Sequence, residues 1–475
     1  MKIILIAFFL LPVLVSRAQL SRSTGLIFDD DKYQRTNRLS LSLKWSESNL
    51  PFVSLKSYCP TPGNQGNIGS CVSWATGYAA MTISRAIQNG NTNRNDITNS
   101  ARSALYIYNQ IKLNNICNPG GSSLDDALQL VQTQGDCLLK DFNPNDCNAP
   151  INSSLRQLAT ESKIKDYYTL FQFNQSADQK IAATMNSLTA NKPVIIGMNI
   201  TSSIFNVGSD GEWNPNTDEP ILGGHAVCVI GYNNNTKRFE ILNSWGPSWG
   251  NGGYFTISYQ DYARYCKYGY QITLENSHPE QPINLSGAFQ FRKFTWIDAA
   301  NNKFEFRNAP VQFDGSYYTL VDGVRLNDYF RISASNITKD QYVYIFSIKP
   351  DRTAEILFPQ RKTIDGVTIK DLPIIPSNKV VLEIPVDPNK GLSTDQVGQD
   401  ILCILYSSTL IPDIEFVIQT VKNSSGDFNT RLKQALGNRL VPQSAITYNQ
   451  STMGIAASTS GKSTIVPLVL KVNVQ

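Results

Sequence analysis

Histidine is scarce in this chain. Its 475 residues include two histidines, His225 and His278, and the second stands beside Pro279 in a stretch without apolar periodicity. Any catalysis by a cysteine and an imidazole in the first half of the chain would therefore have to use His225. From residue 285 onward there is no histidine and one cysteine, Cys403, inside an apolar run. We expect that half to carry little chemistry of its own.

Strong charge and long apolar runs are also missing. The chain has 42 Lys and Arg against 38 Asp and Glu, a formal net charge of +4 and no basic block, which argues against nucleic acid as a partner. Beyond the N-terminal residues no stretch approaches 18 continuous apolar residues, so we expect no membrane span. We expect neither a bound metal nor a cofactor.

The N-terminus has the anatomy of a secretory signal peptide. Residues 1–18 contain one Lys near the start, an apolar run over 3–15 and small residues just before Gln19. We therefore expect an exported protein, periplasmic or extracellular. Disulfides can form in such an oxidising compartment. Because seven of the eight cysteines precede residue 270, at least one of those thiols should stay free.

The rest of the chain divides into four parts. Composition predicts an extended N-terminal arm over 19–50, an α+β domain over 51–275, a proline-containing linker over 276–286 and a mainly β domain over 287–475. In the α+β domain helical signals come first and strand signals later, which favours a helical half that faces a sheet half. The expected helices cover 71–88, 100–113, 122–135 and 176–191, and the expected strands cover 193–200, 224–232, 239–245 and 253–259. In the last part we expect a hairpin over 341–360 and an amphipathic helix over 426–437.

The segment NQGNIGSCVSWATGYAA, residues 64–80, brings Cys71 to the start of an expected helix. A cysteine in the first turn meets unpaired N–H groups and the positive end of the helix dipole, which favour the thiolate. Cys71 is therefore a candidate nucleophile. The alternative is a buried packing residue, because free cysteine is among the most buried residue types.

Two further motifs supply partners for such a nucleophile. His225 stands in LGGHAVCVIGY after Gly223 and Gly224, whose missing side chains leave room for a ligand. Asn243 follows eighteen residues later, and its amide oxygen could accept the His225 N–H without adding a second negative charge. Trp245, two residues further on, could cover that hydrogen bond from water. A strand-end histidine and a turn with a packing tryptophan are the alternative interpretations.

Four motifs in one order give this region a family resemblance. QGNIGSCVSWA, CNPGGSSLDDAL, GGHAVCVIGY and NSWGPSWGNGGYF together resemble the papain family of cysteine peptidases over about 190 residues. The resemblance implies two lobes, one mainly helical and one a small β-barrel, with a substrate cleft between them.

Matched motif by motif, the resemblance also implies a role for each candidate residue. Cys71 would be the nucleophile, His225 the general acid and base, and Asn243 the residue that orients the imidazole. Gln65 would donate to the oxyanion together with the Cys71 backbone N–H. The expected substrate-binding residues are three close-approach glycines and the covering tryptophan: Gly120, Gly121, Gly224 and Trp245.

The chain also departs from the family pattern. Val72 stands where the family usually has Trp after the nucleophile, and Ile68 stands where many members have a half-cystine. The usual partner of Cys117 is therefore missing, and Cys117 should pair elsewhere or stay free. The pairs that we consider are Cys117 with Cys59 and Cys137 with Cys147.

Control of the active site is a second departure. The N-terminal arm lacks the long helical pattern with which pro-segments of this family block the cleft. Control would then fall to the arm itself or to the C-terminal domain, or the enzyme is made active. Within that domain, the run from LNDYF to LFPQ, residues 326–360, resembles a β-rich bacterial domain of uncharacterised function that accompanies kinases and peptidases.

Three functional hypotheses follow from these motifs. The first is an exported cysteine endopeptidase that acts on peptide or protein substrates through a thioacyl intermediate, with a C-terminal domain that binds a protein or surface partner or adds stability. The second is a catalytically decayed papain-fold binding protein, which the complete set of Gln, Cys, His and Asn opposes. The third is a transglutaminase-like acyl transferase, which typically has Asp rather than Asn as its third residue.

Overall fold

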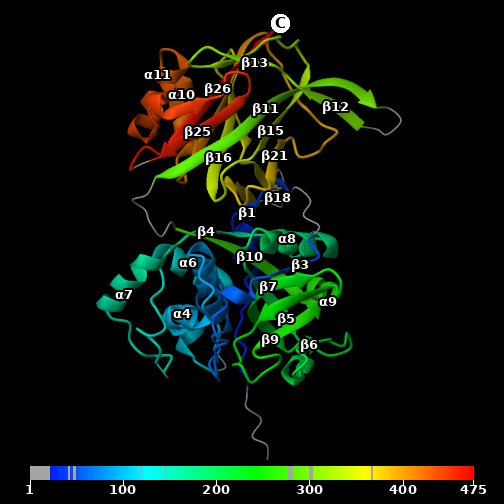
Figure 1. Ribbon diagram of the computed structural model, residues 1–475, viewed down its shortest axis with the longest axis vertical. Helices are drawn as coiled ribbons and strands as arrows, with labels where there is room; N and C mark the ends of the chain where they lie inside the picture. The colour runs from blue at the N-terminus through cyan, green and yellow to red at the C-terminus, as the bar shows by residue number, and fades with distance from the viewer. Residues whose placement is uncertain are drawn as a thin grey trace, which may run out of the picture.

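The described part of the chain forms two bodies, a lower one of helices and strands and an upper one built mainly from strands (Figure 1). The computed structural model describes residues 22–40, 43–45, 50–118, 120–144, 146–275, 282–298, 303–364, 367–459 and 461–475. The predicted signal peptide lies outside these residues. None of the helices described here is long and apolar enough to cross a membrane.

One half of the lower body is helical, and its central element begins at Cys71. The helix runs without a break through α2 (Cys71–Ser73), the π-helical segment η2 (Trp74–Met81) and α3 (Thr82–Gln88). Every residue from 71 to 83 is buried, so this part of the helix has no solvent-exposed face. The other helices of this half are α4 (Arg94–Asn99), α5 (Ala104–Ile111), α6 (Leu124–Thr133) and α7 (Ser153–Ala159).

The helix predicted over 100–113 is shorter than expected. It begins only after Ser103, whose hydroxyl accepts the N–H of Tyr106 at 3.1 Å and so caps the first turn of α5. The expected helices over 122–135 and 176–191 are confirmed as α6 and α8 (Ala177–Thr189). Helix α4 was not predicted.

The other half of the lower body is a sheet with the strand order β4-β10-β5-β7-β8-β9-β6, and β3 lies beside β7. The four strands predicted for this half are confirmed as β5, β7, β8 and β9. Helices and sheet share one continuous apolar core. The strands of this half, with the helix that follows β9, are β3 (Phe52–Ser54), β4 (Ile164–Thr169), β5 (Val194–Ile200), β6 (Glu212–Trp213), β7 (Gly223–Asn233), β8 (Arg238–Leu242), β9 (Tyr254–Ser258), α9 (Tyr259–Tyr265) and β10 (Cys266–Leu274).

The N-terminal arm is more structured than the extended segment that we predicted. It contains α1 (Asp30–Arg35) and the short strands β1 (Arg38–Leu39) and β2 (Leu43–Trp45). Strand β1 pairs with β4 of the lower body and with β19 (Val367–Leu372) of the upper body, while β2 pairs with β21 (Val380–Ile384). The arm therefore joins the sheets of both bodies, and Figure 1 shows β1 between them.

The upper body is mainly β, as predicted. One sheet has the order β2-β21-β15-β11-β25-β24 and the other β13-β14-β26-β23-β16-β17, and their apolar faces enclose a common core. Helices α10 (Ile414–Asn423) and α11 (Phe428–Leu436) pack against the second sheet in a separate apolar cluster. The predicted hairpin is confirmed as β16 and β17, and the predicted amphipathic helix as α11. The remaining strands of these two orders are β11 (Ile283–Asp298), β13 (Val311–Phe313), β14 (Tyr318–Leu320), β15 (Tyr329–Ser335), β16 (Gln341–Ile348), β17 (Ala354–Phe358), β23 (Gly398–Ser407), β24 (Ile446–Tyr448), β25 (Met453–Thr459) and β26 (Ile465–Val474).

The linker predicted over 276–286 overlaps the start of the upper body. Strand β10 ends at Leu274 and β11 begins at Ile283, and residues 276–281 lie outside the described part of the chain. The limits of the two domains at 275 and 287 stay predictions.

Candidate active site

Cys71 occupies the first turn of the central helix, as its sequence position predicts. The N–H groups of Ser73 and Trp74 donate to the Ser70 carbonyl at 3.0 and 3.1 Å and close this turn. The side chain of Cys71 is fully buried, and this burial raises the pKa of the thiol to about 12. Backbone groups of Ala226, Val72 and Leu26 oppose the rise. The expected thiolate character is therefore outweighed by burial in this state of the molecule.

His225 and Asn243 meet as predicted, although they lie on different strands of the sheet. His225 is on β7, opposite Met198 of β5, and Asn243 directly follows β8. The Nε2 atom of His225 lies 2.9 Å from Oδ1 of Asn243. Asn243 Oδ1 also accepts the backbone N–H of Ser244 at 2.8 Å. Because an N–H donor must face an oxygen, this second bond fixes the orientation of the Asn243 amide.

The tautomer of His225 follows from that orientation. Asn243 Oδ1 can only accept, so His225 Nε2 carries the proton, and in the neutral ring Nδ1 is then an acceptor. Nδ1 is buried and has no hydrogen-bond partner among the described residues. Burial lowers the pKa of His225 to about 4, while the bond to Asn243 acts in the opposite direction. The ring is thus neutral at pH 7, with an open acceptor nitrogen.

Aromatic rings cover this pair, as expected for Trp245. The indole ring of Trp245 stacks on the His225 ring with centroids 4.8 Å apart. Phe205 stacks on Trp245 in turn at 5.3 Å, and Trp249 meets it edge-on at 4.9 Å. The layer keeps bulk water away from the His225–Asn243 hydrogen bond, which strengthens it.

Gln65 reaches the same site from the loop before the central helix. Its backbone N–H donates to the Ser244 carbonyl at 2.9 Å, and its side-chain Oε1 accepts the Ser244 hydroxyl at 2.6 Å. The Nε2 group donates to the carbonyls of Ile68 and Ser23, each at 3.0 Å. Ser244 and Ser23 were not predicted as site residues, since neither has a local sequence signal.

The predicted glycines form two facing walls. A Cβ atom at Gly121 would lie 2.7 Å from the Gly25 carbonyl oxygen, and one at Gly224 would lie 2.6 Å from the Leu26 carbonyl oxygen. Gly120 is packed against its own loop, where a Cβ would lie 2.0 Å from the Ile116 carbonyl oxygen. Gly121 and Gly224 therefore border a space in which another backbone can lie close to their own. In this structure Gly25 and Leu26 of the N-terminal arm fill that space.

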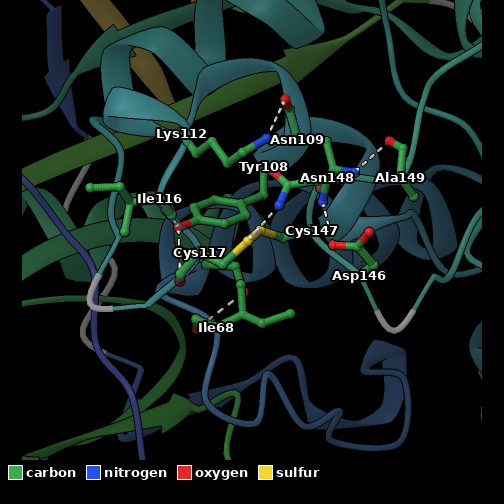
Figure 2. Close-up of a disulfide and its surroundings, with 11 residues drawn as sticks. Ile68, Tyr108, Asn109, Lys112, Ile116, Cys117, Asp146, Cys147, Asn148 and Ala149 are labelled. Atoms are coloured by element: carbon green, nitrogen blue, oxygen red, sulfur yellow. Dashed lines mark hydrogen bonds between the residues drawn. A yellow bond between two sulfur atoms is a disulfide. The ribbon is translucent and has the colours of Figure 1, made fainter.

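The disulfide near this wall corrects both predicted pairings. Cys117 is bonded to Cys147, with Cα atoms 6.0 Å apart, whereas Cys59 and Cys137 are reduced and buried (Figure 2). Ile68 lies beside the bridge, where the family's half-cystine is expected, so Cys117 takes a partner from a later loop. The expectation that at least one of the first seven cysteines stays free is confirmed.

The disulfide also anchors the loop that carries Gly120 and Gly121. The Cys117 carbonyl accepts the Gly69 N–H at 3.0 Å, and the Tyr108 hydroxyl donates to the Ile116 carbonyl at 3.2 Å. The glycine wall is thereby tied to the loop before Cys71. Among the described residues, the one group of His, Cys, Asp and Glu side chains close enough to hold a metal is Cys117, Asp146 and Cys147. Its two sulfurs are bonded to each other and are not thiolate ligands.

Comparison with known proteins finds a family match for part of this chain. Residues 54–274 match the family model of the papain family cysteine protease. The uncharacterized peptidase C1-like protein L477 of Acanthamoeba polyphaga mimivirus is 28% identical over 205 residues, which is 42% of this chain and 64% of that protein. Cathepsin K of Mus musculus is 27% identical over 208 residues, 43% of this chain and 57% of that protein. The chain thus spans less than two thirds of the length of either relative.

A solved structure has a similar outline. The cysteine protease xylellain from Xylella fastidiosa superposes with a TM-score of 0.43 at 20% identity, over 56% of this chain and 100% of that chain.

Proposed function

We propose that this chain, whose residues 54–274 form a papain-like domain, is a cysteine peptidase that hydrolyses peptide bonds through a thioacyl intermediate on Cys71. The observation that carries the proposal is the His225–Asn243 pair, which leaves the imidazole neutral with a bare Nδ1. The backbone of Ala226, the residue after His225, faces the Cys71 thiol. Nucleophilic catalysis needs an acceptor nitrogen within reach of the thiol, and in this proposal His225 Nδ1 supplies it to Cys71.

The steps follow from these positions. His225 Nδ1 takes the thiol proton, and the Cys71 sulfur attacks the peptide carbonyl carbon. The oxyanion then accepts N–H bonds from the Gln65 side chain and the Cys71 backbone, each worth about 3 kcal/mol in the transition state. His225 returns the proton to the leaving amine, and water attacks the thioester with the same histidine as base. Asn243 stabilises the imidazolium form without adding charge.

Substrate would bind as an extended backbone between Gly121 and Gly224, where no Cβ blocks close approach. Endopeptidase action fits a cleft of this kind, and we include it in the proposal. We also propose export, because the N-terminal 18 residues have signal-peptide anatomy and the Cys117–Cys147 bridge suits an oxidising compartment. N-terminal sequencing of secreted protein that begins at Gln19 would support this; retention of Met1 would contradict it.

The decisive experiment labels the protein with an epoxide inhibitor selective for papain-like peptidases. Intact mass analysis after prolonged incubation should show one adduct on wild type and none on Cys71→Ala. Cys228→Ala is the matched control, because Cys228 is an equally buried, reduced cysteine on β7. The rate of peptide cleavage between pH 5 and 8 should fall by at least about 1,000-fold in Cys71→Ala, while Cys228→Ala should cleave like wild type. An adduct on Cys71→Ala, or no adduct and no cleavage in any of the proteins, would contradict the proposal in favour of a binding protein.

A further inference from the structure

We propose that a cavity in the C-terminal body, named here the α11 cavity, binds the C-terminal carboxylate of a peptide whose last residue is apolar. The α11 cavity is lined by residues of helix α11, the segment over 437–445, strand β24 and strand β26. Figure 1 shows α11 and β26 in the upper body, apart from the domain that carries Cys71 and His225. The inference therefore does not rest on the proposed peptidase function.

The floor of the α11 cavity is apolar. Leu432 of α11, Val441, Ile446 of β24 and Val469 of β26 line it, and all four are buried. Leu432 and Val469 belong to the apolar cluster under α11, whereas Val441 and Ile446 belong to the core between the two sheets. The volume is about 390 Å³, and pockets for small ligands span about 300–1,000 Å³. The floor can therefore take an apolar side chain out of water.

Contacts within the protein hold the walls of the α11 cavity in place. The Tyr448 hydroxyl donates to the Pro467 carbonyl at 2.8 Å, and the Gln443 side-chain N–H donates to the Gly315 carbonyl. Gly437 ends α11 with φ +55°, and a Cβ at this position would have no atom within 4 Å. The mouth is therefore open beside Gly437 and the walls are preformed, which lowers the free-energy cost of binding.

One unpaired positive charge lies at the rim. Lys433 of α11 is exposed, and its ammonium group has no carboxylate and no hydrogen-bond partner among the described residues. None of the residues that line the α11 cavity in the described part of the chain is Asp or Glu. An ammonium group beside an apolar floor, with no acidic side chain around it, favours a ligand that carries an anionic group.

The aspartates that precede the rim are already committed to local hydrogen bonds. Asp314 Oδ1 accepts the N–H groups of Ser316 and Tyr317 at 2.8 and 2.7 Å. Asp427 Oδ1 accepts the N–H of Thr430 at 2.8 Å and so caps the first turn of α11. These carboxylates hold a turn and a helix end, which leaves the rim lysine to a ligand.

The neutral groups of the rim favour a peptide over a fatty acid. The Ser316 hydroxyl and the Asn429 side-chain amide have no partner among the described residues, and Gln443 Oε1 is a further acceptor. Each peptide unit offers one N–H donor and one carbonyl acceptor, whereas an acyl chain offers neither. A peptide end can thus place its carboxylate at Lys433, its last side chain on the floor and its backbone against these three groups.

The test measures peptide binding to the full chain by isothermal titration calorimetry. Every protein carries Cys71→Ala, so that the probe is not consumed. We expect saturable binding of acetyl-Gly-Gly-Leu with a free carboxylate. Binding should be at least about tenfold weaker for the same peptide as its C-terminal amide, which lacks the charge, and for acetyl-Gly-Gly-Gly, which lacks the apolar side chain. Octanoate, which has a carboxylate and an apolar chain but no peptide group, should also bind more weakly.

Two substitutions of the exposed lysine locate the site without disturbing the core. Lys433→Met should weaken binding of the free acid by about tenfold and leave binding of the amide unchanged, and Lys433→Glu should weaken binding of the free acid further. The matched control is Lys390→Met in the same body, where the lysine side chain is 72% exposed and lies outside the cavity lining. Bound peptide should also slow hydrogen–deuterium exchange over 440–446.

Equal binding of the free acid and the amide would overturn the inference, as would unchanged binding in both Lys433 variants. No heat of binding at millimolar peptide would do the same. Tighter binding of octanoate than of acetyl-Gly-Gly-Leu would assign the α11 cavity to an acyl chain and so contradict the peptide. None of these outcomes bears on the peptidase proposal, because all the proteins lack the Cys71 thiol.

Discussion

At the scale of single residues, the orientation and tautomer of His225 in the candidate active site depend on the amide oxygen of Asn243. Asn243 Oδ1 accepts from both Ser244 and His225, which leaves the imidazole with one possible neutral tautomer. Without that acceptor, the buried Nε2–H loses its partner and the ring can turn or shift its proton. In the proposed mechanism Asn243 is therefore a positioning residue for His225.

Asn243→Ala should lower kcat/KM by about 10- to 100-fold, the range expected when a buried donor loses its partner. The measurement is the rate of peptide hydrolysis by the purified full chain. Asn174→Ala, at an exposed asparagine, is the control. Equal activity of the Asn243→Ala and Asn174→Ala proteins would contradict the assigned role.

The buried histidine predicts a dependence of stability on pH. Burial lowers the pKa of His225 from its ordinary value of 6.5 to about 4 in the folded protein, so the unfolded chain binds the proton first as pH falls. Above pH 6.5 the neutral His225 ring costs the folded protein no stability. Between about pH 6.5 and 4 the free energy of unfolding falls by about 3 kcal/mol, because protons bind the unfolded chain more tightly. Urea unfolding gives the free energy of unfolding of wild type and His225→Gln at pH 7 and pH 4. Between these two pH values the variant should lose about 3 kcal/mol less than wild type. The same loss in both proteins would refute the assignment.

At the scale of elements, a loop and a helix start define the helical wall of the cleft. The helix that begins at Cys71 contains the π-helical segment η2, and its residues from 71 to 83 are all buried, so packing holds Cys71 in place. The Cys117–Cys147 bridge ties the glycine loop to the polypeptide 30 residues further along. Both devices hold backbone positions that a substrate strand must match.

Cys147→Ser should therefore affect both stability and substrate binding. Loss of a bridge that closes a loop of this length lowers the free energy of unfolding by about 3 kcal/mol. KM should rise more than kcat falls, because Gly120 and Gly121 lose their anchor while the proposed catalytic residues keep their contacts. Thermal unfolding and peptide kinetics measure the two effects, and Cys137→Ser, at a buried reduced cysteine, is the control. Unchanged KM in Cys147→Ser would refute the link between the bridge and the glycine wall.

At the scale of the whole molecule, the arm is shared between the two bodies. Asp371 of the upper body is buried and binds both Arg38 and the Ser40 hydroxyl, at 2.8 and 2.7 Å. Lys165 of β4 donates to the carbonyls of Asp340 and Ser408 at 2.9 and 3.0 Å. The arm and the β4 edge together connect the C-terminal body to the papain-like domain.

Asp371→Ala should loosen the arm at a distance from the cleft. It leaves Arg38 without its buried partner, which weakens the pairing of β1. We expect hydrogen–deuterium exchange of the peptide that contains β1 to accelerate by about two- to tenfold over wild type. The control is Asp322→Ala, at an exposed aspartate of the same body. Exchange at the wild-type rate would show that Asp371 does not hold β1.

Elements with strong local signals were predictable, and long-range partners were not. Strands β5, β7, β8 and β9 follow from apolar runs bounded by turns, and α6 and α8 from helical periodicity with serine caps. The break before α5 was missed, because one serine cap outweighs the apolar pattern around it. The cysteine pairing failed because spacing along the chain says little about which loops meet in space.

The sequence alone determined which residues bear the candidate chemistry. His225 was the sole imidazole available to a cysteine nucleophile in the α+β domain, since His278 lies in the proline-containing stretch, and the motifs around Cys71 and Asn243 marked those residues as its candidate partners. The tertiary structure decided what lies beside the glycines Gly121 and Gly224. Residues 22–28 of the N-terminal arm are held there through backbone N–H and C=O groups, which nearly every residue carries, and through contacts such as that between Ser23 and Trp245, 222 positions apart. Such contacts leave no periodic pattern in the sequence, and they exist only once both lobes and the C-terminal body have folded.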